Sequence, residues 1–168
     1  MIIAANLLAG LQLGPICYED NATLAKIIRA ALIELDANQP GSAFDDKSTD
    51  SLFALFQTHR SVYYVAELET NIVGGSGIYP TKGLPADTCE LVRMYLVAET
   101  RGLGIGKVLL DKCLDTAKEF GYKKIYLETK PQLMLALKIY KQYGFENCDE
   151  PLGNSGHYGC EILMIKTI

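Results

Sequence analysis

Three glycines alternate with two aliphatic residues between Arg101 and Lys107, in the segment RGLGIG, and this spacing is typical of a backbone that comes close to a ligand. An apolar, strand-like run precedes the segment and an apolar helical pattern follows it. Glycines at such a junction let successive backbone N–H groups point into one concavity, because no Cβ blocks the approach and unusual φ angles are allowed. The dipole of the following helix adds roughly 0.3–1 kcal/mol for a charged group there. The pattern therefore predicts an anion-binding site, and phosphate is the expected ligand.

Two well-known phosphate motifs do not match this segment. A P-loop needs GxxxxGK followed by Ser or Thr, and here Val108 follows Lys107. A dinucleotide fingerprint needs GxGxxG, whereas the segment reads GxGxG, although Glu128 is placed where a ribose-binding acid would be. Only one β-α-β crossover is predicted, which also disfavours this motif. A plain strand-to-helix turn is a further alternative, but a plain turn needs one glycine and this one has three.

Length and composition limit the possible classes of protein. With 168 residues, of which 49% are hydrophobic, the chain can close one sizeable core, so we expect a single domain over residues 1–168. The net charge of −4 offers no general attraction to nucleic acid or to an anionic membrane. Residues 1–16 are apolar but lack an early Lys or Arg and a membrane-spanning length, so we interpret them as folded chain without a targeting segment.

Five cysteines stand at uneven spacings without a CxxC pair, which indicates a reduced, cytoplasmic setting. Cys148, His157 and Cys160 could be imagined as zinc ligands. Their spacing is unusual, however, and no fourth ligand is evident nearby. Small buried thiols and a loop histidine are the favoured interpretation, and we expect no metal.

The strand before the glycines and the helices after them must position the anion site. Residues 89–97 alternate as a strand, which predicts that Glu90 shares a face with Leu96. The apolar stripe that starts at Gly104 predicts a helix that ends near Gly121, a C-cap candidate. A second apolar stripe predicts a helix from Pro131, which suits a first turn, to Gly144.

The remaining pattern predicts a sheet with few crossovers. Helices are expected over residues 20–35, with Asp20 as N-cap, and over residues 49–57, joined by the polar loop 37–50. Strands are expected within residues 61–68, 72–80, 123–129, 144–149 and 160–168. With one crossover in a hairpin-rich order, the fold class is α/β of the α+β type: a central mixed, mostly antiparallel sheet flanked by helices.

Two segments in order resemble one known family. RGLGIG resembles the Q/R-x-x-G-x-G/A motif of the GNAT superfamily of acyl-coenzyme A N-acyltransferases, and it lies between a long strand and a helix as in that family. ALKIYKQYGFE resembles the family's final A-x-x-x-Y-x-x-x-G-F element. The resemblance covers Cys89 to Glu146 closely and the whole chain in element order. It implies a GNAT-like fold and acetyl-coenzyme A as acyl donor.

The resemblance also implies where the cofactor binds. Backbone N–H groups from Gly102 to Lys107 would cradle the pyrophosphate, and the strand end would pair with the pantetheine amides. Arg101 would brace the loop or the phosphate, unless it is a solvated surface arginine. Many relatives carry Asn where this chain has Leu133, with Gln132 adjacent, so that contact is expected to differ. The expected cofactor-binding residues are Met94, Tyr95, Leu96, Arg101, Gly102, Leu103, Gly104, Ile105, Gly106 and Lys107.

Acyl transfer from a thioester to an amine needs a neutral amine, donors for the oxyanion and a proton for the departing thiolate. The resemblance implies direct attack by a primary amine, with the Leu96 N–H as oxyanion donor and Tyr140 as general acid. By pattern alone, Tyr140 is a core tyrosine on an apolar stripe. Glu90 is the candidate base, acting directly or through water, or else a polar residue at a strand end. His157 either lines the acceptor site or is a turn residue.

Other functions stay open at this point. The main alternative is a GNAT-like domain that binds acyl-coenzyme A without turnover, as a sensor; another is a different nucleotide-binding protein. The acceptor could be a small-molecule amine or a peptide or protein amine, chosen by loops 37–50, 81–87 and 151–159. Acidic residues near these loops would suit a cationic acceptor. Residues 160–168 could pair two copies into a homodimer if that edge is exposed.

Overall fold

The structure is a computed structural model that describes residues 8–168, so residues 1–7 of the predicted folded start lie outside the described residues. The strands are β1 Leu11–Pro15, β2 Val62–Leu68, β3 Asn71–Tyr79, β4 Thr88–Leu96, β5 Lys124–Thr129, β6 Glu146–Asn147 and β7 Ile162–Thr167. The α-helices are α2 Asn21–Glu34, α3 Leu52–Leu55, α4 Ile105–Glu119 and α5 Met134–Gln142, and the 3-10 helices are η1 Tyr18–Asp20, η2 Lys47–Ser51 and η3 Ala98–Thr100. Over this range, no helix combines the length and the apolar character needed to cross a membrane.

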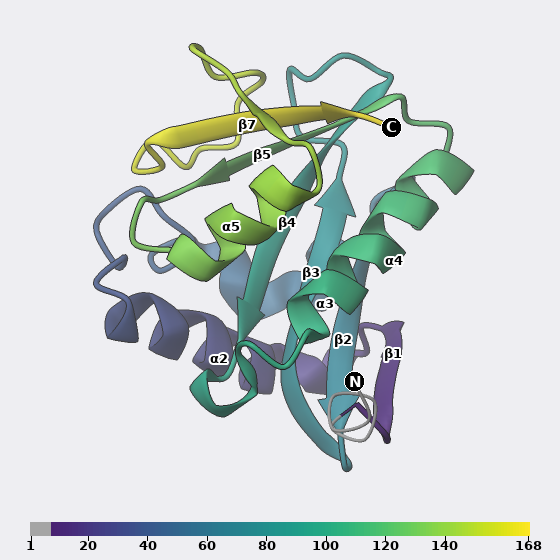
Figure 1. Cartoon of the computed structure of the whole chain (residues 1–168), viewed down its shortest axis with the longest axis vertical. Helices are drawn as coiled ribbons and strands as arrows, with labels where there is room; N and C mark the ends of the chain where they lie inside the picture. The colour runs from purple at the N-terminus through teal and green to yellow at the C-terminus, as the bar shows by residue number, and fades with distance from the viewer. Residues whose placement is uncertain (1–7) are drawn as a thin grey trace.

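The described strands form one seven-stranded sheet in the order β1-β2-β3-β4-β5-β7-β6 (Figure 1). Among these strands, β4 and β5 are the parallel pair and every other neighbouring pair is antiparallel. The parallel pair is joined through α4, which is the single crossover that the residue pattern predicts. The predicted fold class, a mixed and mostly antiparallel sheet flanked by helices, is confirmed.

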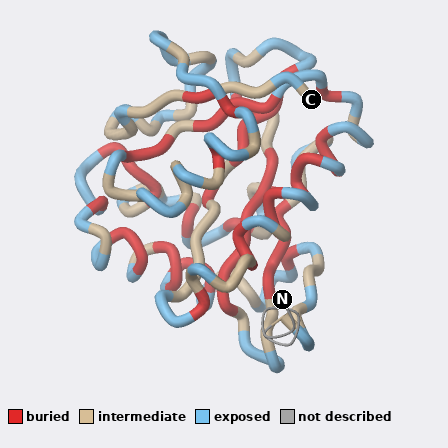
Figure 2. The backbone as a smooth tube through the Cα atoms, in the orientation of Figure 1, coloured by how far each residue is buried: buried red, intermediate tan, exposed pale blue. Residues whose placement is uncertain are grey.

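Helices cover the two faces of the sheet in pairs. Helices α4 and α5 lie on one face, and α2 and α3 lie on the other (Figure 1). Residues such as Leu109 and Leu127 build the core on the α4 side, and Leu32 and Val65 belong to the separate core on the α2 side. The buried parts of the chain run along the middle of the sheet and the inner turns of the helices (Figure 2). The sheet therefore separates two compartments.

Several element ends differ from the predicted ones. Asp20 is the residue before α2, but its carboxylate accepts the Cys17 N–H at 2.7 Å and so caps η1 instead. Gly121 follows α4 with φ +81°, as expected of a C-cap glycine. Helix α5 begins at Met134, so Pro131 is outside its first turn; the chain first makes a turn in which the Leu133 N–H donates to the Lys130 carbonyl at 3.1 Å.

A β-bulge in β4 changes the predicted alternation. Val92 is opposite Gly77 and Tyr95 is opposite Gly75, so two residues of β4 face one residue of β3 between these pairs. Arg93, one of the two, has φ +50°. The extra residue moves everything after it to the other face of the sheet. The expectation that Glu90 shares a face with Leu96 is therefore wrong.

The cores on either side show the result of the bulge. Leu91, Met94 and Leu96 pack into the core on the α4 side, whereas Val92 and Tyr95 pack on the α2 side. Alternation before the bulge places Glu90 on the same side as Val92. Its carboxyl group thus faces the α2 compartment.

The predicted terminal strand is not at the edge of the sheet. Strand β7 lies between β5 and β6, and β6 covers it only at Ile165 and Met164. Beyond Met164, the loop after β6 runs along this side of β7, and its Cys148 N–H donates to the Leu163 carbonyl at 2.8 Å. Pairing of two copies through this strand stays a prediction.

Candidate functional site

The two parallel strands separate and open a cleft in the sheet. Strands β4 and β5 pair only from Thr88 to Glu90 and from Lys124 to Tyr126. Beyond that point the bulge turns β4 away. The cleft between them reaches both compartments: on the α4 side it is lined by Leu91, Met94, Leu127, Ala136 and Tyr140, and on the α2 side by Glu90, Val92, Arg93, Glu128, Lys130 and His157.

The glycine segment presents free backbone donors at the start of α4. Gly102 and Gly104 have φ angles of +80° and +96°, in the left-handed region that favours glycine. None of the N–H groups from Gly102 to Gly106 donates to an acceptor within residues 8–168. The Lys107 N–H, by contrast, donates to the Gly104 carbonyl at 3.1 Å. Backbone donors of the kind expected for an anion site are therefore available from Gly102 to Gly106.

Arg101 braces this loop against two elements. Its Nε donates to the Leu96 carbonyl at 3.0 Å, and its Nη1 forms an ion pair with Glu34 Oε1 at 2.9 Å. These contacts join the end of β4 to the last residue of α2. Bracing the loop was one of the roles expected for Arg101, and its side chain is largely buried instead of solvated.

The Leu96 N–H faces the side on which β5 has moved away. The neighbouring Val97 N–H donates to the Val73 carbonyl of β3 at 2.8 Å. Successive residues of an antiparallel strand point their backbone groups to alternate sides, so the N–H and carbonyl of Leu96 point away from β3. The carbonyl is taken by Arg101. The N–H is placed as a donor toward the open side of β4.

Tyr140 reaches the cleft from α5. Its side chain is buried, its ring lies 5.6 Å from that of Phe145, and its hydroxyl makes no hydrogen bond with another residue of the described range 8–168. Burial raises the pKa of Tyr140 well above its usual value near 10, and Tyr95 and Cys113 raise it further. The phenol is thus a protonated donor that has no hydrogen-bond partner among the described residues.

Glu90 reaches the same cleft from the opposite face of the sheet. Its carboxyl group is 3% exposed and accepts a hydrogen bond from the Thr81 hydroxyl. Burial raises the pKa of Glu90 to about 7, against the lowering effects of the Thr81 hydrogen bond and of the charges of His157 and Arg93, while Glu128 raises it. A carboxyl group of this pKa can take up and release a proton near neutral pH.

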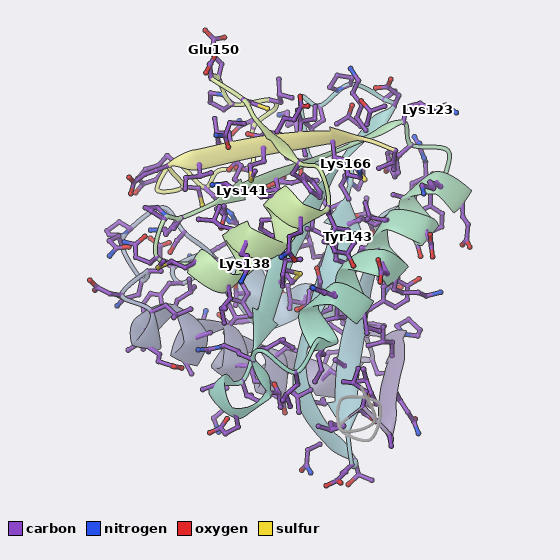
Figure 3. All side chains as sticks on the ribbon, in the orientation of Figure 1. Lys123, Lys138, Lys141, Tyr143, Glu150 and Lys166 are labelled. Carbon is purple, nitrogen blue, oxygen red and sulfur yellow. The ribbon has the colours of Figure 1, made fainter. Side chains whose placement is uncertain are left out.

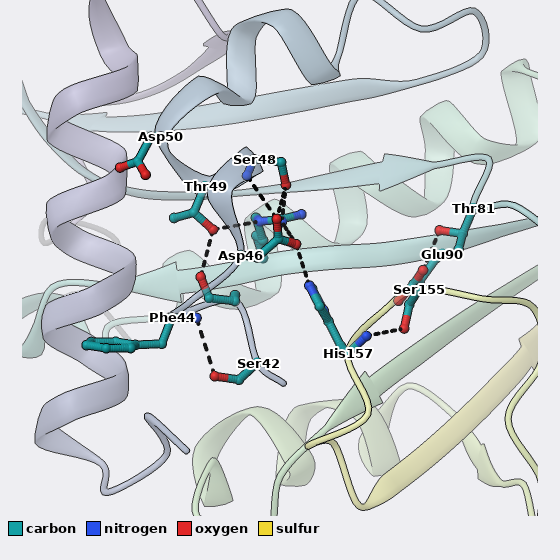
Figure 4. A network of polar contacts seen from close by, with 12 residues as sticks. Ser42, Phe44, Asp46, Ser48, Thr49, Asp50, Thr81, Glu90, Ser155 and His157 are labelled. Carbon is teal, nitrogen blue, oxygen red and sulfur yellow. Dashed lines mark hydrogen bonds and ion pairs between the residues drawn. The ribbon is translucent and has the colours of Figure 1, made fainter. Parts of the chain in front are cut away.

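A polar network covers the α2 side of the cleft (Figure 4). Arg93 Nη2 lies 2.8 Å from both Asp46 Oδ2 and Ser48 Oγ. His157 Nε2 lies 2.7 Å from the same Asp46 oxygen, and the His157 N–H donates to Ser155 Oγ at 3.1 Å. Ser155 in turn donates to Glu128 Oε2 at 2.6 Å. The network joins β4 to two loops that are far apart in the sequence.

The three loops expected to choose the acceptor meet here. The Gly159 N–H donates to the Gly41 carbonyl at 2.9 Å, which ties loop 151–159 to loop 37–50. The Asn154 N–H donates to the Lys82 carbonyl at 2.7 Å, which ties it to loop 81–87. His157 is held by Asp46 and is not simply a turn residue. Within the described residues, no group of three or more His, Cys, Asp or Glu side chains could hold a metal ion.

Sequence reasoning missed several residues of this site. Arg93 resembles an ordinary strand residue, and only the bulge turns it toward Asp46. Lys130 follows β5 and is 2% exposed although it carries a charge. Alternation along β5 puts Glu128 on the side of Tyr126, which is opposite Glu90 in register, and Lys130, just after the strand, donates to Gln39 of loop 37–50. That alternation is the one sequence signal that could have grouped these residues.

A glycine segment between a long strand and a helix, whose N–H groups have no acceptor within residues 8–168, is the arrangement that the resemblance to the GNAT superfamily implies. The model of the Acetyltransferase (GNAT) family matches residues 29–145, and the chain belongs to that family. The predicted family and the prediction of an acyltransferase enzyme are confirmed.

Two named N-acetyltransferases are similar in sequence to this chain, one over most of its length and the other over a part. The uncharacterized N-acetyltransferase YjgM of Escherichia coli is 37% identical over 152 residues, which are 89% of this chain and 90% of that protein. Human N-acetylaspartate synthetase is 35% identical over 99 residues, 58% of this chain but only 30% of its own length. The similarity to YjgM therefore extends beyond the motif region.

Solved structures share the fold. The PaiA N-acetyltransferase of Thermoplasma acidophilum, solved in complex with coenzyme A, superposes with a TM-score of 0.75 at 20% identity over 94% of this chain and 99% of that one. An acetyltransferase of Streptococcus agalactiae gives a TM-score of 0.79 at 14% identity over 95% of this chain and 99% of that one. At such identities the agreement concerns the fold alone.

Proposed function

We propose that this protein moves the acetyl group of acetyl-coenzyme A to a primary amine, which attacks the thioester directly, with Tyr140 as general acid. The observation that carries the proposal is the position of Tyr140 and Glu90. A protonated phenol without a hydrogen-bond partner in the part of the chain that the structure describes, and a carboxyl group with a pKa near 7, line one cleft from opposite faces of the sheet. An acid and a base so separated suit a reaction whose two substrates enter from two sides.

The residues present fit coenzyme A. The free N–H groups of Gly102 to Gly106 suit a pyrophosphate, which is the group such a helix start binds. Thr129 Oγ1 and Gln132 Oε1 are buried polar atoms without a hydrogen-bond partner in the described structure. Gln132 is next to the position where many relatives carry Asn, so its oxygen is a candidate partner for a pantetheine N–H. A structural neighbour, PaiA, was solved with coenzyme A.

The remaining cofactor contacts follow the family resemblance. Met94, Tyr95 and Leu96 would pair with the pantetheine amides along the free side of β4, where β5 no longer pairs. Arg101 would hold the loop in place through the Leu96 carbonyl. The backbone N–H of Lys107 already donates to the Gly104 carbonyl, so it is not available to the pyrophosphate. The exposed Lys107 side chain would instead contribute its positive charge beside the pyrophosphate.

The chain's own residues supply the acid, the base and the oxyanion donor. Acetyl-coenzyme A brings the acetyl thioester when it is bound. Glu90 takes a proton from the acceptor ammonium, directly or through water, so that the amine nitrogen can form a bond to the acetyl carbon. The Leu96 N–H donates to the oxygen that becomes negative. As the carbon–sulfur bond breaks, Tyr140 gives its proton to the sulfur, the nitrogen of the new amide loses its extra proton to solvent, and Tyr140 recovers a proton from solvent.

The test is the loss of thioester absorbance from acetyl-coenzyme A across a panel of amines, amino acids and peptide N-termini. This readout avoids thiol reagents, which would also react with the five cysteines. We expect amine-dependent turnover, with kcat at least about 100-fold lower in Tyr140→Phe because the general acid is lost. Binding of acetyl-coenzyme A should be unchanged in that variant.

Tyr143→Phe is the matched control, because it removes a hydroxyl from the same region of the chain. Tyr143 follows α5 and faces α4, away from the cleft lining (Figure 3). Its substitution should leave kcat within about twofold. Equal turnover by Tyr140→Phe and the parent enzyme would refute the acid role of Tyr140. Binding of acetyl-coenzyme A without turnover of any amine would favour the sensor domain instead.

A further inference from the structure

Lys130 is a buried lysine that has no ion-pair partner among residues 8–168. It follows β5, is 2% exposed, and lines the cleft. Its Nζ donates one hydrogen bond, to Gln39 Oε1 at 2.8 Å, and no carboxylate within residues 8–168 forms an ion pair with it. A lysine ammonium has three donors, and burial of a charge beside a neutral partner alone is costly. Two donors of Lys130 are therefore free for a ligand.

Two carboxylates on the same side of the cleft have no cation. Glu90 is held by the Thr81 hydroxyl, and Glu128 accepts from the Tyr126 hydroxyl at 2.9 Å and from Ser155 at 2.6 Å. Neither forms an ion pair within the described structure. The nearby Arg93, by contrast, is paired with Asp46. Along the α2 side of the cleft, the described lining thus holds one lysine and two carboxyl groups that have no ion-pair partner.

These charges lie in a fixed order along the strands. Glu90 is opposite Tyr126, Glu128 follows Tyr126 by two residues on the same face, roughly 6–7 Å along the strand, and Lys130 comes directly after the end of β5. All three charged groups lie close enough to Cys160 to change the pKa of its thiol. Burial raises that pKa to about 12, the charges of Glu128 and Glu90 raise it further, and the charge of Lys130 lowers it. The negative and positive groups are therefore next to each other around one place in the cleft.

We propose that the acceptor is a free amino acid, whose ammonium binds at Glu90 and Glu128 and whose carboxylate binds Lys130. The inference rests on the acetyl transfer proposed above and names its substrate class. A zwitterion satisfies both sets of unpaired charges with one small molecule. A peptide N-terminus has no carboxylate beside its amine, and a polyamine would bring a second cation next to the buried Lys130.

Three forms of each acceptor test this class. Free amino acids are compared with their amides and with the amines left after removal of the carboxyl group, for example phenylalanine, phenylalaninamide and phenethylamine, across the common side chains. We expect kcat/KM to be at least tenfold higher for the best free acid than for its amide or its decarboxylated amine. A preference for the amide or for the decarboxylated amine would overturn the inference and leave acetyl transfer standing.

Variants of Lys130 test the carboxylate contact. Lys130→Met should raise KM for the free acid at least tenfold, with kcat nearly unchanged and with little effect on the decarboxylated amine. Lys130→Arg should restore most of the affinity, because it keeps the charge. Lys124→Met, an exposed position on the same strand, should change neither parameter. Equal losses for acid and amine in Lys130→Met would show a structural role only and refute the contact.

Calorimetric binding separates this inference from the proposed function. Free acid and amide are titrated into the protein loaded with coenzyme A, a measurement that needs no turnover. Tighter binding of the acid by at least tenfold, lost in Lys130→Met, would support the zwitterion site even if no acceptor were acetylated. Absence of any preference between acid and amide would overturn it, whatever the turnover assay showed.

Discussion

His157 Nε2 lies 2.7 Å from Asp46 Oδ2, across a separation of 111 residues in the sequence. The same carboxylate oxygen lies 2.8 Å from Arg93 Nη2, and Arg93 is in the bulge of β4. Asp46 thus links the two acceptor-side loops to the irregularity that opens the cleft (Figure 4). The loops and the strand are expected to hold one another in place.

Substitution of Asp46→Asn should lower the free energy of unfolding at pH 7 by about 2–3 kcal/mol, because buried Arg93 loses its counter-ion. The hydrogen bond with His157 holds the pKa of Asp46 well below its usual range, aided by Ser48 and by the charge of Arg93 and opposed by burial. A depressed carboxyl pKa gives stability that is present above the unfolded value near 3.8 and is lost as the pH falls below it. Urea unfolding at pH 7 and pH 3 should show the difference from the parent shrink at the lower pH.

Asp50→Asn is the control for this prediction. Asp50 also pairs with an arginine, Arg29 at 2.5 Å, but its carboxylate is largely exposed to solvent. Exposed ion pairs contribute little, so this variant should unfold almost as the parent does. Equal losses in both variants would contradict the special role of the Asp46 link.

The rate of acetyl transfer should rise with pH through about 7, because Glu90 must lose its proton to act as base. In Glu90→Gln this limb of the kcat/KM profile should disappear, and the rate should then follow only the ionisation of the acceptor amine. Glu146→Gln, an exposed carboxyl on β6, should keep the limb. A profile of Glu90→Gln that still bends near pH 7, on top of the rise that the acceptor amine causes, would remove Glu90 from the base role.

The same carboxyl group should make folding depend on pH. The folded pKa of Glu90, about 7, is above its ordinary value of 4.5, so the folded state holds the proton more tightly. The contribution of Glu90 to the free energy of unfolding is therefore greatest below pH 4.5. It falls by on the order of 3 kcal/mol as the pH rises from 4.5 toward 7. The difference in unfolding free energy between Glu90→Gln and the parent should grow in the variant's favour over that range.

Gly104→Ala should weaken coenzyme A binding more than it weakens the fold. Its φ of +96° costs an alanine about 1 kcal/mol, and relief of that strain would turn the free N–H groups away from the anion. Gly121, at the other end of α4, has φ +81° and open space beside it, so Gly121→Ala should cost similar stability. Calorimetry with coenzyme A should separate the two variants. Equal affinities would argue against the glycine segment as the pyrophosphate site.

Local patterns were enough to predict the elements around the glycine segment. The strand before it, the helix from Ile105 to Glu119 and the glycine that ends that helix follow from alternation, from an apolar stripe and from the backbone freedom of glycine. Each depends on neighbours within a few residues, which is why one sequence suffices to infer it. The same reasoning misplaced the start of α5, because a turn after β5 delays the helix beyond Pro131.

Long-range pairing decided the rest of the site. The bulge at Arg93 arises from the register between β3 and β4, which alternation within one strand cannot reveal, and it moved Leu96 to the face opposite Glu90. The meeting of His157 with Asp46 depends on where two loops end in space.

Short-range spacing in the sequence was therefore enough to identify the family, and it also predicts the glycine anion site and the tyrosine of the last motif. Only the tertiary structure decided which charges of the cleft are paired. Whether Lys130 has an ion-pair partner depends on its distance from each carboxylate around it, and those distances are set only when the sheet and its loops have folded together.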